Sequence, residues 1–241
     1  MIYLLAKPAE RAFFAMPNTA APAASRVSLI IPLGPGEPEN PPVSHWVEQA
    51  RQAGIRCLVS AVNPADWRSA PDLEWVLGPA GRGQQMNRAA ARAEGSEWLW
   101  FLHADSRPCP RVLPAVLTLC RSSDECLGWF RLAYATDGPR LTRLNAVAAN
   151  LRSRWLKLPY GDQGLILPRR WFMRLGGFHE ALVRGEDLDL VVRAQRAGLE
   201  LRALDGYVTT SARRYADQGW LKTTWRHQLS AWRLVREARR S

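Results

Sequence analysis

The chain has 241 residues, of which 47% are hydrophobic and 23% are charged, and its formal net charge is +11 at pH 7. This length and composition suit one large domain, or one domain with appendages, and exclude a wholly disordered chain or a disulfide-stapled miniprotein. No apolar run is long enough for a membrane-spanning helix.

The basic excess, 33 Lys and Arg against 22 Asp and Glu, has two readings. Arginine-favouring codon usage explains it, and so does a polyanionic partner such as a phosphate-bearing substrate, an anionic membrane or a nucleic acid. The four cysteines (Cys57, Cys109, Cys120 and Cys126) form no C-x-x-C pair and no zinc-finger spacing. They predict reduced thiols and a cytoplasmic protein.

The first 25 residues read as an appendage. Their opening is too interrupted by Lys7, Glu10 and Arg11 for the apolar region of a signal peptide, and an Ala/Pro-rich stretch follows. We predict a disordered extension over 1–25, or a translation start at Met16.

From residue 26 on, strands and helices alternate along the first half of the chain. Apolar runs predict strands over 27–32, 57–62, 73–77 and 97–105, and helices are expected over 43–53 and 84–93. This alternation predicts an α/β fold with a mostly parallel central sheet and helices on both faces. Ligands of such sheets bind at the carboxyl ends of the strands, where Asp105 is expected.

The second half is less regular. A strand is expected over 125–135, a helix over 141–156, a loop over 159–164 and a short strand over 165–167. A further helix begins near Pro168 and is closed by Gly176-Gly177, and the last helix of this part covers 185–198.

The C-terminal segment 216–241 predicts a basic amphipathic helix. A largely apolar stripe is formed by Leu221, Trp225, Gln228, Leu229, Trp232 and Val235. The basic residues on the rest of the helix are Lys222, Arg226, Arg233, Arg236, Arg239 and Arg240. Such a helix either packs on the domain or lies on an anionic membrane, which would place the protein at the inner membrane face.

Three acidic positions are candidates for chemistry, because P-loop, dinucleotide-binding and nucleophile-elbow motifs are absent. Asp105 either caps a turn or binds a divalent cation, Mg²⁺ or Mn²⁺. Asp162 and Gln163 lie on a glycine-flanked loop that could recognise hydroxyls. Glu186 and Asp187 either cap a helix or supply a general base.

Four strings together closely resemble one group of family 2 glycosyltransferases, the small bacterial members catalogued near arsenosugar biosynthesis and radical-enzyme-associated transferases. The strings are GRGQQMNRAAARAEGSEWLWFLHADS (81–106), PYGDQGLILPRRWFMRLGGF (159–178), GEDLDL (185–190) and TSARRY (210–215). The resemblance covers roughly 26–235. It implies a GT-A-type fold in a single catalytic domain over 26–215, with a nucleotide half (26–106) and an acceptor half (107–215).

The resemblance also implies inverting transfer from a nucleotide-diphosphate sugar to an unknown hydroxyl acceptor, which could be lipid-linked, with a divalent cation. It places Asp187 as the catalytic base with Glu186 beside it, Asp105 as the metal ligand, and Asp162 and Gln163 on the acceptor side. The residues it places near the nucleotide and diphosphate are Pro32, Arg82, Asn87, His103, Arg213 and Arg214.

Two departures from the family pattern affect the base and ribose contacts. The stretch after the first strand keeps only Glu37 of an expected Asn-Glu pair, and SAVNPAD, with Ala61 and Asp66, replaces an Asp-Gly-Gly-Ser-like turn. The altered region leaves open a catalytically impaired relative that acts as a binding or partner protein. Nucleic-acid binding is disfavoured, because no recognised motif accompanies the arginines and tryptophans.

Overall fold

The computed structural model describes residues 26–35, 44–62, 73–139 and 141–212. Its strands are β1 (Val27–Leu33), β2 (Arg56–Ala61), β3 (Glu74–Leu77), β4 (Trp98–Phe101), β5 (Arg107–Pro108), β6 (Cys126–Tyr134), β7 (Ile166–Pro168) and β8 (Glu200–Thr210). Its helices are α1 (Ser44–Gln52), α2 (Arg82–Arg92), α3 (Val112–Arg121), α4 (Thr142–Trp155), α5 (Arg169–Arg174) and α6 (Glu186–Arg196), with a 3-10 turn at Gly161–Gln163.

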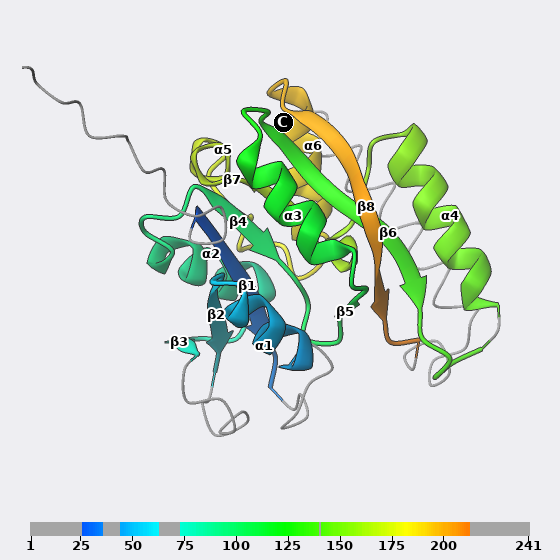
Figure 1. Cartoon of the computed structure of the whole chain (residues 1–241), viewed down its shortest axis with the longest axis horizontal. Helices are drawn as coiled ribbons and strands as arrows, with labels where there is room; N and C mark the ends of the chain where they lie inside the picture. The colour runs from blue at the N-terminus through cyan, green and yellow to red at the C-terminus, as the bar shows by residue number, and fades with distance from the viewer. Residues whose placement is uncertain (1–25, 36–43, 63–72, 140, 213–241) are drawn as a thin grey trace, which may run out of the picture.

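The described strands form one sheet in the order β3-β2-β1-β4-β7-β6-β8-β5 (Figure 1). β1 pairs in parallel with β2 and β4, β2 pairs in parallel with β3, and β6 pairs in parallel with β8. The short strands β7 and β5 make the antiparallel pairs. A mostly parallel sheet, as predicted, therefore carries the carboxyl ends of β1, β2 and β4 at one edge.

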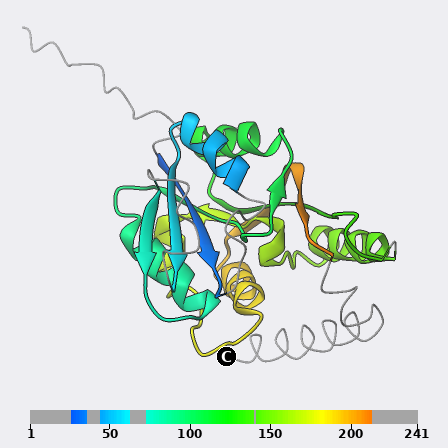
Figure 2. The ribbon, with the colours of Figure 1, turned by 90° about the horizontal axis from the view of Figure 1, so that it is seen from below.

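Helices cover both faces of the sheet, which confirms the prediction. Seen from below, α1 and α3 lie on one side of the strands and α2 and α6 lie on the other (Figure 2). Alternate side chains of the strands divide between two cores. Trp46 of α1 and Val116 of α3 belong to one core, whereas Met86 of α2 and Leu190 of α6 belong to the other.

Three elements were not predicted from the sequence: β5, α3 and β8. α3 contains Pro114, which its first turn tolerates. β8 runs through an Asp205-Gly206 pair that is typical of turns. Gly206 has a φ of 111°, and a Cβ there would lie 3.0 Å from Val112 Cγ2, so close packing on α3 requires glycine.

The strand expected over 97–105 is shorter than predicted. β4 ends at Phe101, and Asp105 lies in the following turn. The four cysteines are buried free thiols. No helix in the described ranges combines the length and apolar character that crossing a bilayer requires. The predicted extension 1–25 and the predicted C-terminal helix over 216–241 lie outside the described residues.

Candidate active site

The first turn of α6 holds the predicted acidic pair. Gly185 precedes the helix with a left-handed φ of 81°, and Glu186, Asp187 and Asp189 follow within one turn. Carboxylates there interact favourably with the positive end of the helix dipole. Asp187 is only 8% exposed. Its Oδ1 accepts a hydrogen bond from the Leu188 amide at 2.8 Å, and its Oδ2 accepts one from the Gly161 amide.

Glu186 is fully buried and pairs with Arg82, the first residue of α2. The Arg82 Nε donates to Glu186 Oε1, while Glu186 Oε2 is buried without a hydrogen-bond partner among the described residues. Burial raises the pKa of Glu186, and the nearby Arg82 opposes that shift. The pair therefore links the predicted nucleotide side, α2, to the helix that carries the predicted base.

The pKa of Asp187 is lowered despite its burial. Burial alone would raise it, but the positive charge of Arg82, the amide of Gly161 and the charge of His103 outweigh that effect. Asp187 is therefore held as a carboxylate, which is the state that a general base needs before it accepts a proton.

Gly161 brings the 159–164 loop between two of the predicted site residues. A Cβ at this position would lie 2.8 Å from Asp187 Oδ2 and 2.9 Å from His103 Nε2. Only glycine leaves both side chains in place. Three motifs that are far apart in the sequence, around His103, Gly161 and Asp187, therefore meet at one point.

Asp162 lies beside this point, with its Oδ1 buried and without a hydrogen-bond partner among the described residues. Burial raises its pKa to about 6; the charges of Asp187 and Asp105 add to the shift, and those of Arg152 and Arg82 oppose it. A buried oxygen without a partner is suited to accept a hydrogen bond from a ligand hydroxyl.

Asp162→Asn should make the protein more stable at pH 8 but not at pH 4. The raised pKa means that the folded state keeps a proton that the unfolded state has lost between about pH 4 and 6. Wild-type stability therefore falls as the pH rises through that window, and the whole penalty persists above it. The uncharged amide removes the penalty, a gain of roughly 3 kcal/mol or about 9 °C in Tm.

Thermal melts at both pH values test this expectation, with the exposed Asp205→Asn as the control. A variant that is less stable than wild type at pH 8 would show that attraction to Arg152 dominates and that Asp162 is ionised at no cost.

Gln163, the second predicted acceptor-side residue, is fully buried and hydrogen-bonded through both its amide oxygen and its amide nitrogen. Its Oε1 accepts hydrogen bonds from the Ser153 hydroxyl at 2.7 Å and the Tyr160 amide at 3.1 Å, and its Nε2 donates to the Phe130 carbonyl at 3.0 Å. It fastens the 159–164 loop to α4 and β6. Its predicted contact with acceptor stays a prediction.

Arg152 was not singled out from the sequence. Its guanidinium lies over the Tyr160 ring, 3.5 Å from the centroid, and its Nη2 is buried without a hydrogen-bond partner among the described residues. The arginine also donates from Nε to the Leu158 carbonyl. The sequence of the predicted helix over 141–156 contains three arginines, and no local pattern distinguishes Arg152 from the other two.

Asp105, the predicted metal ligand, accepts a hydrogen bond from the Thr210 hydroxyl at 2.9 Å. Thr210 ends β8, so its approach to Asp105 could not be read from the local pattern. Within the described ranges, no group of three or more His, Cys, Asp and Glu residues forms a metal cluster. Mg²⁺ in phosphate-transfer sites is commonly bound by one or two carboxylates plus substrate phosphates. A partly buried Asp105 fits that mode of binding.

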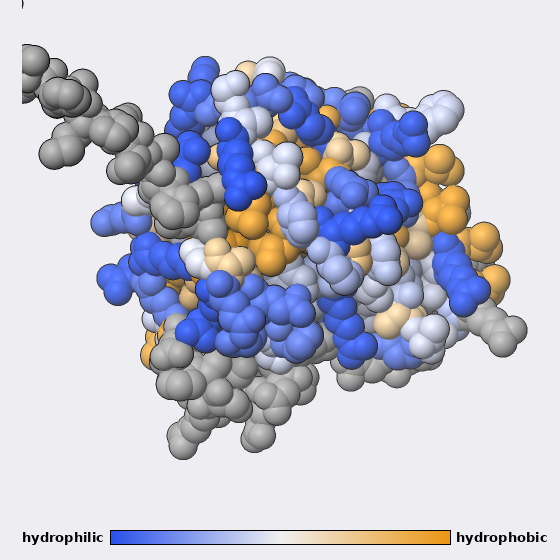
Figure 3. All heavy atoms as spheres, in the orientation of Figure 1, coloured by the Kyte–Doolittle hydropathy of each residue, from blue (hydrophilic) through white to orange (hydrophobic). Residues whose placement is uncertain are grey.

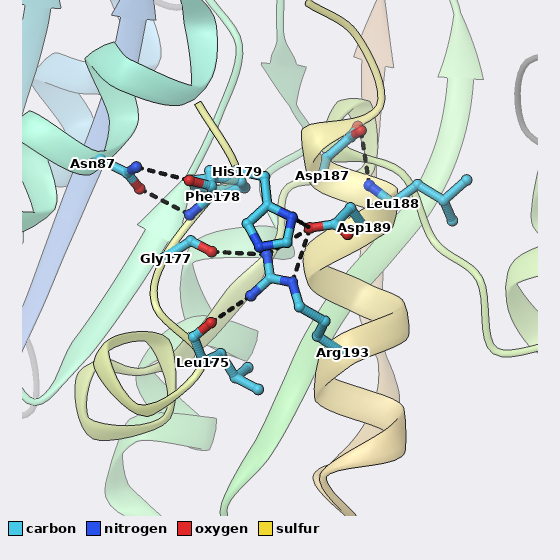
Figure 4. A network of polar contacts seen from close by, with 9 residues as sticks. All are labelled: Asn87, Leu175, Gly177, Phe178, His179, Asp187, Leu188, Asp189 and Arg193. Carbon is cyan, nitrogen blue, oxygen red and sulfur yellow. Dashed lines mark hydrogen bonds and ion pairs between the residues drawn. The ribbon is translucent and has the colours of Figure 1, made fainter. Parts of the chain in front are cut away.

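Asn87 has partners of its own. Its amide nitrogen donates to the Phe178 carbonyl at 2.9 Å, and its amide oxygen accepts from the Phe178 amide at 2.9 Å (Figure 4). The nitrogen also donates to Glu180. A nucleotide contact from Asn87 would exchange these bonds, and it stays a prediction. Pro32 is buried near the end of β1, beside Ser60 of β2.

Phe178 and Glu180 belong to a loop over 175–180. Asp189, which was not among the predicted site residues, holds this loop from the α6 side. Its Oδ2 pairs with Arg193 at 2.7 Å and with His179 at 3.0 Å. Arg193 in turn donates to the Leu175 and Gly177 carbonyls (Figure 4). Asp189 therefore has a structural role, in contrast to the role predicted for Asp187.

Arg213 and Arg214 lie outside the described residues, as do Glu37 and Asp66. The chain immediately before the arginines is fixed by Asp137, another residue that the sequence did not indicate. Asp137 accepts hydrogen bonds from the Ala212 amide at 2.7 Å and the Ser211 hydroxyl at 2.6 Å. Ala61 is buried at the end of β2.

Solved glycosyltransferase structures share this fold. GalNAc-T7 with UDP, GalNAc and Mn²⁺ is 13% identical over 78% of this chain and 44% of its own, with a TM-score of 0.57. The mannosyltransferase PcManGT from Pyrobaculum calidifontis, in complex with GDP-Man and Mn²⁺, is 16% identical over 79% and 60%, with a TM-score of 0.53. S. aureus TarS 1-349, in complex with UDP-GlcNAc, is 14% identical over 78% and 59%, with a TM-score of 0.57.

This chain therefore spans less than two thirds of the length of each of these three proteins. No protein-family model and no curated protein matches the sequence. At 12–16% sequence identity, the likeness to these structures shows the fold alone. It confirms the predicted GT-A-type α/β architecture for the described part of the chain.

Proposed function

We propose that this protein is an inverting, metal-dependent glycosyltransferase of family 2 that moves a sugar from a nucleotide-diphosphate donor to a hydroxyl acceptor. One observation carries the proposal: Asp187, Gly161 and His103 converge at one point, with Asp105 and Asp162 within electrostatic reach. The UDP, GDP-Man and UDP-GlcNAc bound to the structural neighbours support a nucleotide-sugar donor. The sequence motifs resemble the small bacterial group named above.

The proposed reaction assigns Asp187 to the acceptor. An acceptor hydroxyl is a weak nucleophile, so Asp187 takes its proton as the oxygen bonds to the anomeric carbon. The bond from that carbon to the diphosphate oxygen breaks at the same time, through a transition state like an oxocarbenium ion. Attack opposite the leaving group inverts the anomeric configuration.

The other residues act on charge and position. A divalent cation bound with Asp105 would offset the negative charge that develops on the leaving diphosphate. Arg82, Arg213 and Arg214 are proposed diphosphate contacts, and Pro32, Asn87 and His103 line the nucleotide side. Asp162 is proposed to bind acceptor, with Gln163 holding its loop. The impaired-enzyme alternative is not favoured, because Asp187 keeps a lowered pKa beside the other site residues.

A thermal-shift screen tests the donor and the metal together. UDP, GDP, CDP and dTDP would each be added with and without Mn²⁺, and the nucleotide that binds should raise Tm by about 5 °C or more near saturation only when Mn²⁺ is present. Asp105→Ala should lose the Mn²⁺-dependent part of that shift, while the exposed Asp205→Ala should keep it. Equal metal dependence in wild type and Asp105→Ala would reject Asp105 as the ligand.

A positive nucleotide would then be offered as its sugar conjugates. Slow release of free sugar in the absence of an acceptor is the expected signature of a transferase site. If no nucleotide shifts Tm and no donor sugar is released, the proposed function is wrong.

A further inference from the structure

The outer side of α4 is apolar and exposed. Leu144 is 58% exposed, Val147 56%, Leu151 51% and Trp155 77%. Their spacing of three and four residues places them on one stripe of the helix. These four residues define the outer α4 stripe; Leu141 and Leu156, which flank the helix at its two ends, are also exposed. The buried positions of α4, opposite the stripe, are Thr142, Ala146, Ala149 and Ser153.

Both views of the ribbon place α4 at the margin of the molecule, beside the β6 and β8 end of the sheet (Figures 1 and 2). In the space-filling view, hydrophobic side chains gather along that margin (Figure 3). Single exposed apolar residues are ordinary, whereas a continuous row along one helix is a candidate interaction surface.

The charges around the stripe indicate the kind of partner. α4 contains no Asp or Glu, and its exposed Arg143 and Arg154 are eleven residues apart, three helical turns, on one flank of the stripe. The whole chain carries a net charge of +11. An apolar stripe with arginines beside it and a tryptophan at its end is the pattern of a helix that lies in a membrane interface.

We propose that the outer α4 stripe docks into the headgroup region of an anionic membrane. Its leucines and Trp155 enter the apolar boundary, and Arg143 and Arg154 remain at the level of the lipid phosphates. This contact is separate from the basic C-terminal segment, whose apolar stripe was recognised from the sequence.

The buried side of α4 reaches the candidate site. Ser153 donates to Gln163, and Arg152 lies over Tyr160, next to Asp162. A membrane on the outer side would therefore lie one helix away from the proposed acceptor side. This step rests on the proposed function, and it assigns the acceptor to the class of lipid-linked hydroxyl compounds.

Two other occupants fit the stripe less well. A helix face about 21 Å long and 10 Å wide covers on the order of 200 Å², far below the roughly 800 Å² per partner of a stable dimer, and a two-fold pair would bring like charges together. The chain's own segment 216–241 is also strongly basic, with six Lys and Arg residues from Lys222 to Arg240. An anionic bilayer complements both charge and hydrophobicity.

Vesicle flotation of the full chain tests the proposal without any donor sugar. Wild type should float with phosphatidylglycerol-containing vesicles at low salt, bind pure phosphatidylcholine weakly, and dissociate as salt rises. Leu144→Glu/Leu151→Glu should lower the partition coefficient about tenfold or more. Arg143→Gln/Arg154→Gln should lower it several-fold and weaken its salt dependence. Val183→Glu, at an exposed apolar site elsewhere, should bind as wild type does.

Specific results would overturn the proposal. One is wild type that stays unbound at low salt, and another is equal binding by wild type and Leu144→Glu/Leu151→Glu. A third is loss of binding only in Trp225→Glu/Leu229→Glu, which would assign the contact to the C-terminal segment. A fourth is a wild-type protein that forms a dimer and does not bind vesicles, if Leu144→Glu/Leu151→Glu dissociates that dimer. This result would mean that the stripe binds a second copy of the chain.

Tm measurements on each variant serve as the control for folding. Asp187→Asn should float like wild type, so the vesicle result and the proposed catalytic function can fail independently.

Discussion

Asp187→Asn should reduce turnover by about 100-fold or more while the protein still binds its nucleotide, because the amide cannot accept the acceptor's proton. The native carboxylate is poised for that step by Arg82 and by the amides of Gly161 and Leu188. The amide nitrogen of Asn would face one of these donors, so a loss of about 1 kcal/mol in stability is also expected. Single-turnover assays with saturating donor, and nucleotide titrations, measure the two effects separately.

Asp189→Asn is the matched control for this prediction, since it lies one residue beyond Leu188 on the same helix and holds Arg193 and His179. It should lower Tm at least as much as Asp187→Asn does, but with a far smaller loss of turnover. If Asp187→Asn has unchanged turnover, or if the two variants lose turnover equally, Asp187 is not the catalytic base.

Arg82→Leu should lower the free energy of unfolding by about 3 kcal/mol at pH 8, because it leaves Glu186 buried without its ion-pair partner. The figure lies toward the low end for a buried pair, since the Arg82 side chain is 40% exposed. Burial raises the pKa of Glu186, so the lone carboxyl is charged at high pH and takes up a proton as the pH falls. The cost of Arg82→Leu should therefore shrink toward acidic pH.

A double-mutant cycle isolates this interaction. Glu186→Gln removes that buried charge, so Arg82→Leu/Glu186→Gln should recover part of the stability that Arg82→Leu loses. The part not recovered reflects the loss of Arg82 beside the buried Asp187 carboxylate. Urea titrations at two pH values measure all four corners of the cycle. Additive losses in the double variant would mean that Arg82 stabilises the fold through contacts other than Glu186.

The elements with strong local patterns could be predicted from the sequence. β1, which contains Pro32, and the helix that begins after Gly185 lie close to their predicted bounds, whereas the strand before Asp105 is found but ends four residues earlier than predicted. β8 was missed because its Asp205-Gly206 pair is typical of a turn. Its extended course depends on pairing with β6 and on packing against Val112, both distant in the sequence.

The candidate site shows the same limit. The motifs around His103, Gly161 and Asp187 were recognised by resemblance, and the structure brings them together. The roles of polar side chains depend on partners that no local pattern reveals. Asn87 bonds to Phe178, Gln163 to Ser153, and Asp137 to Ala212 across separations of 91, 10 and 75 residues. These contacts arise only when the chain has folded.

The 175–180 loop lies between α2 and α6 and is bonded to both, through Asn87 on one side and Arg193 on the other. Separating the two helices would break these hydrogen bonds together with the Arg82–Glu186 pair, at a cost of about 1 kcal/mol for each neutral bond. We therefore expect the proposed base and the helix on the nucleotide side to move together. The entropy of aligning them is lost once, during folding, and not again in every catalytic cycle.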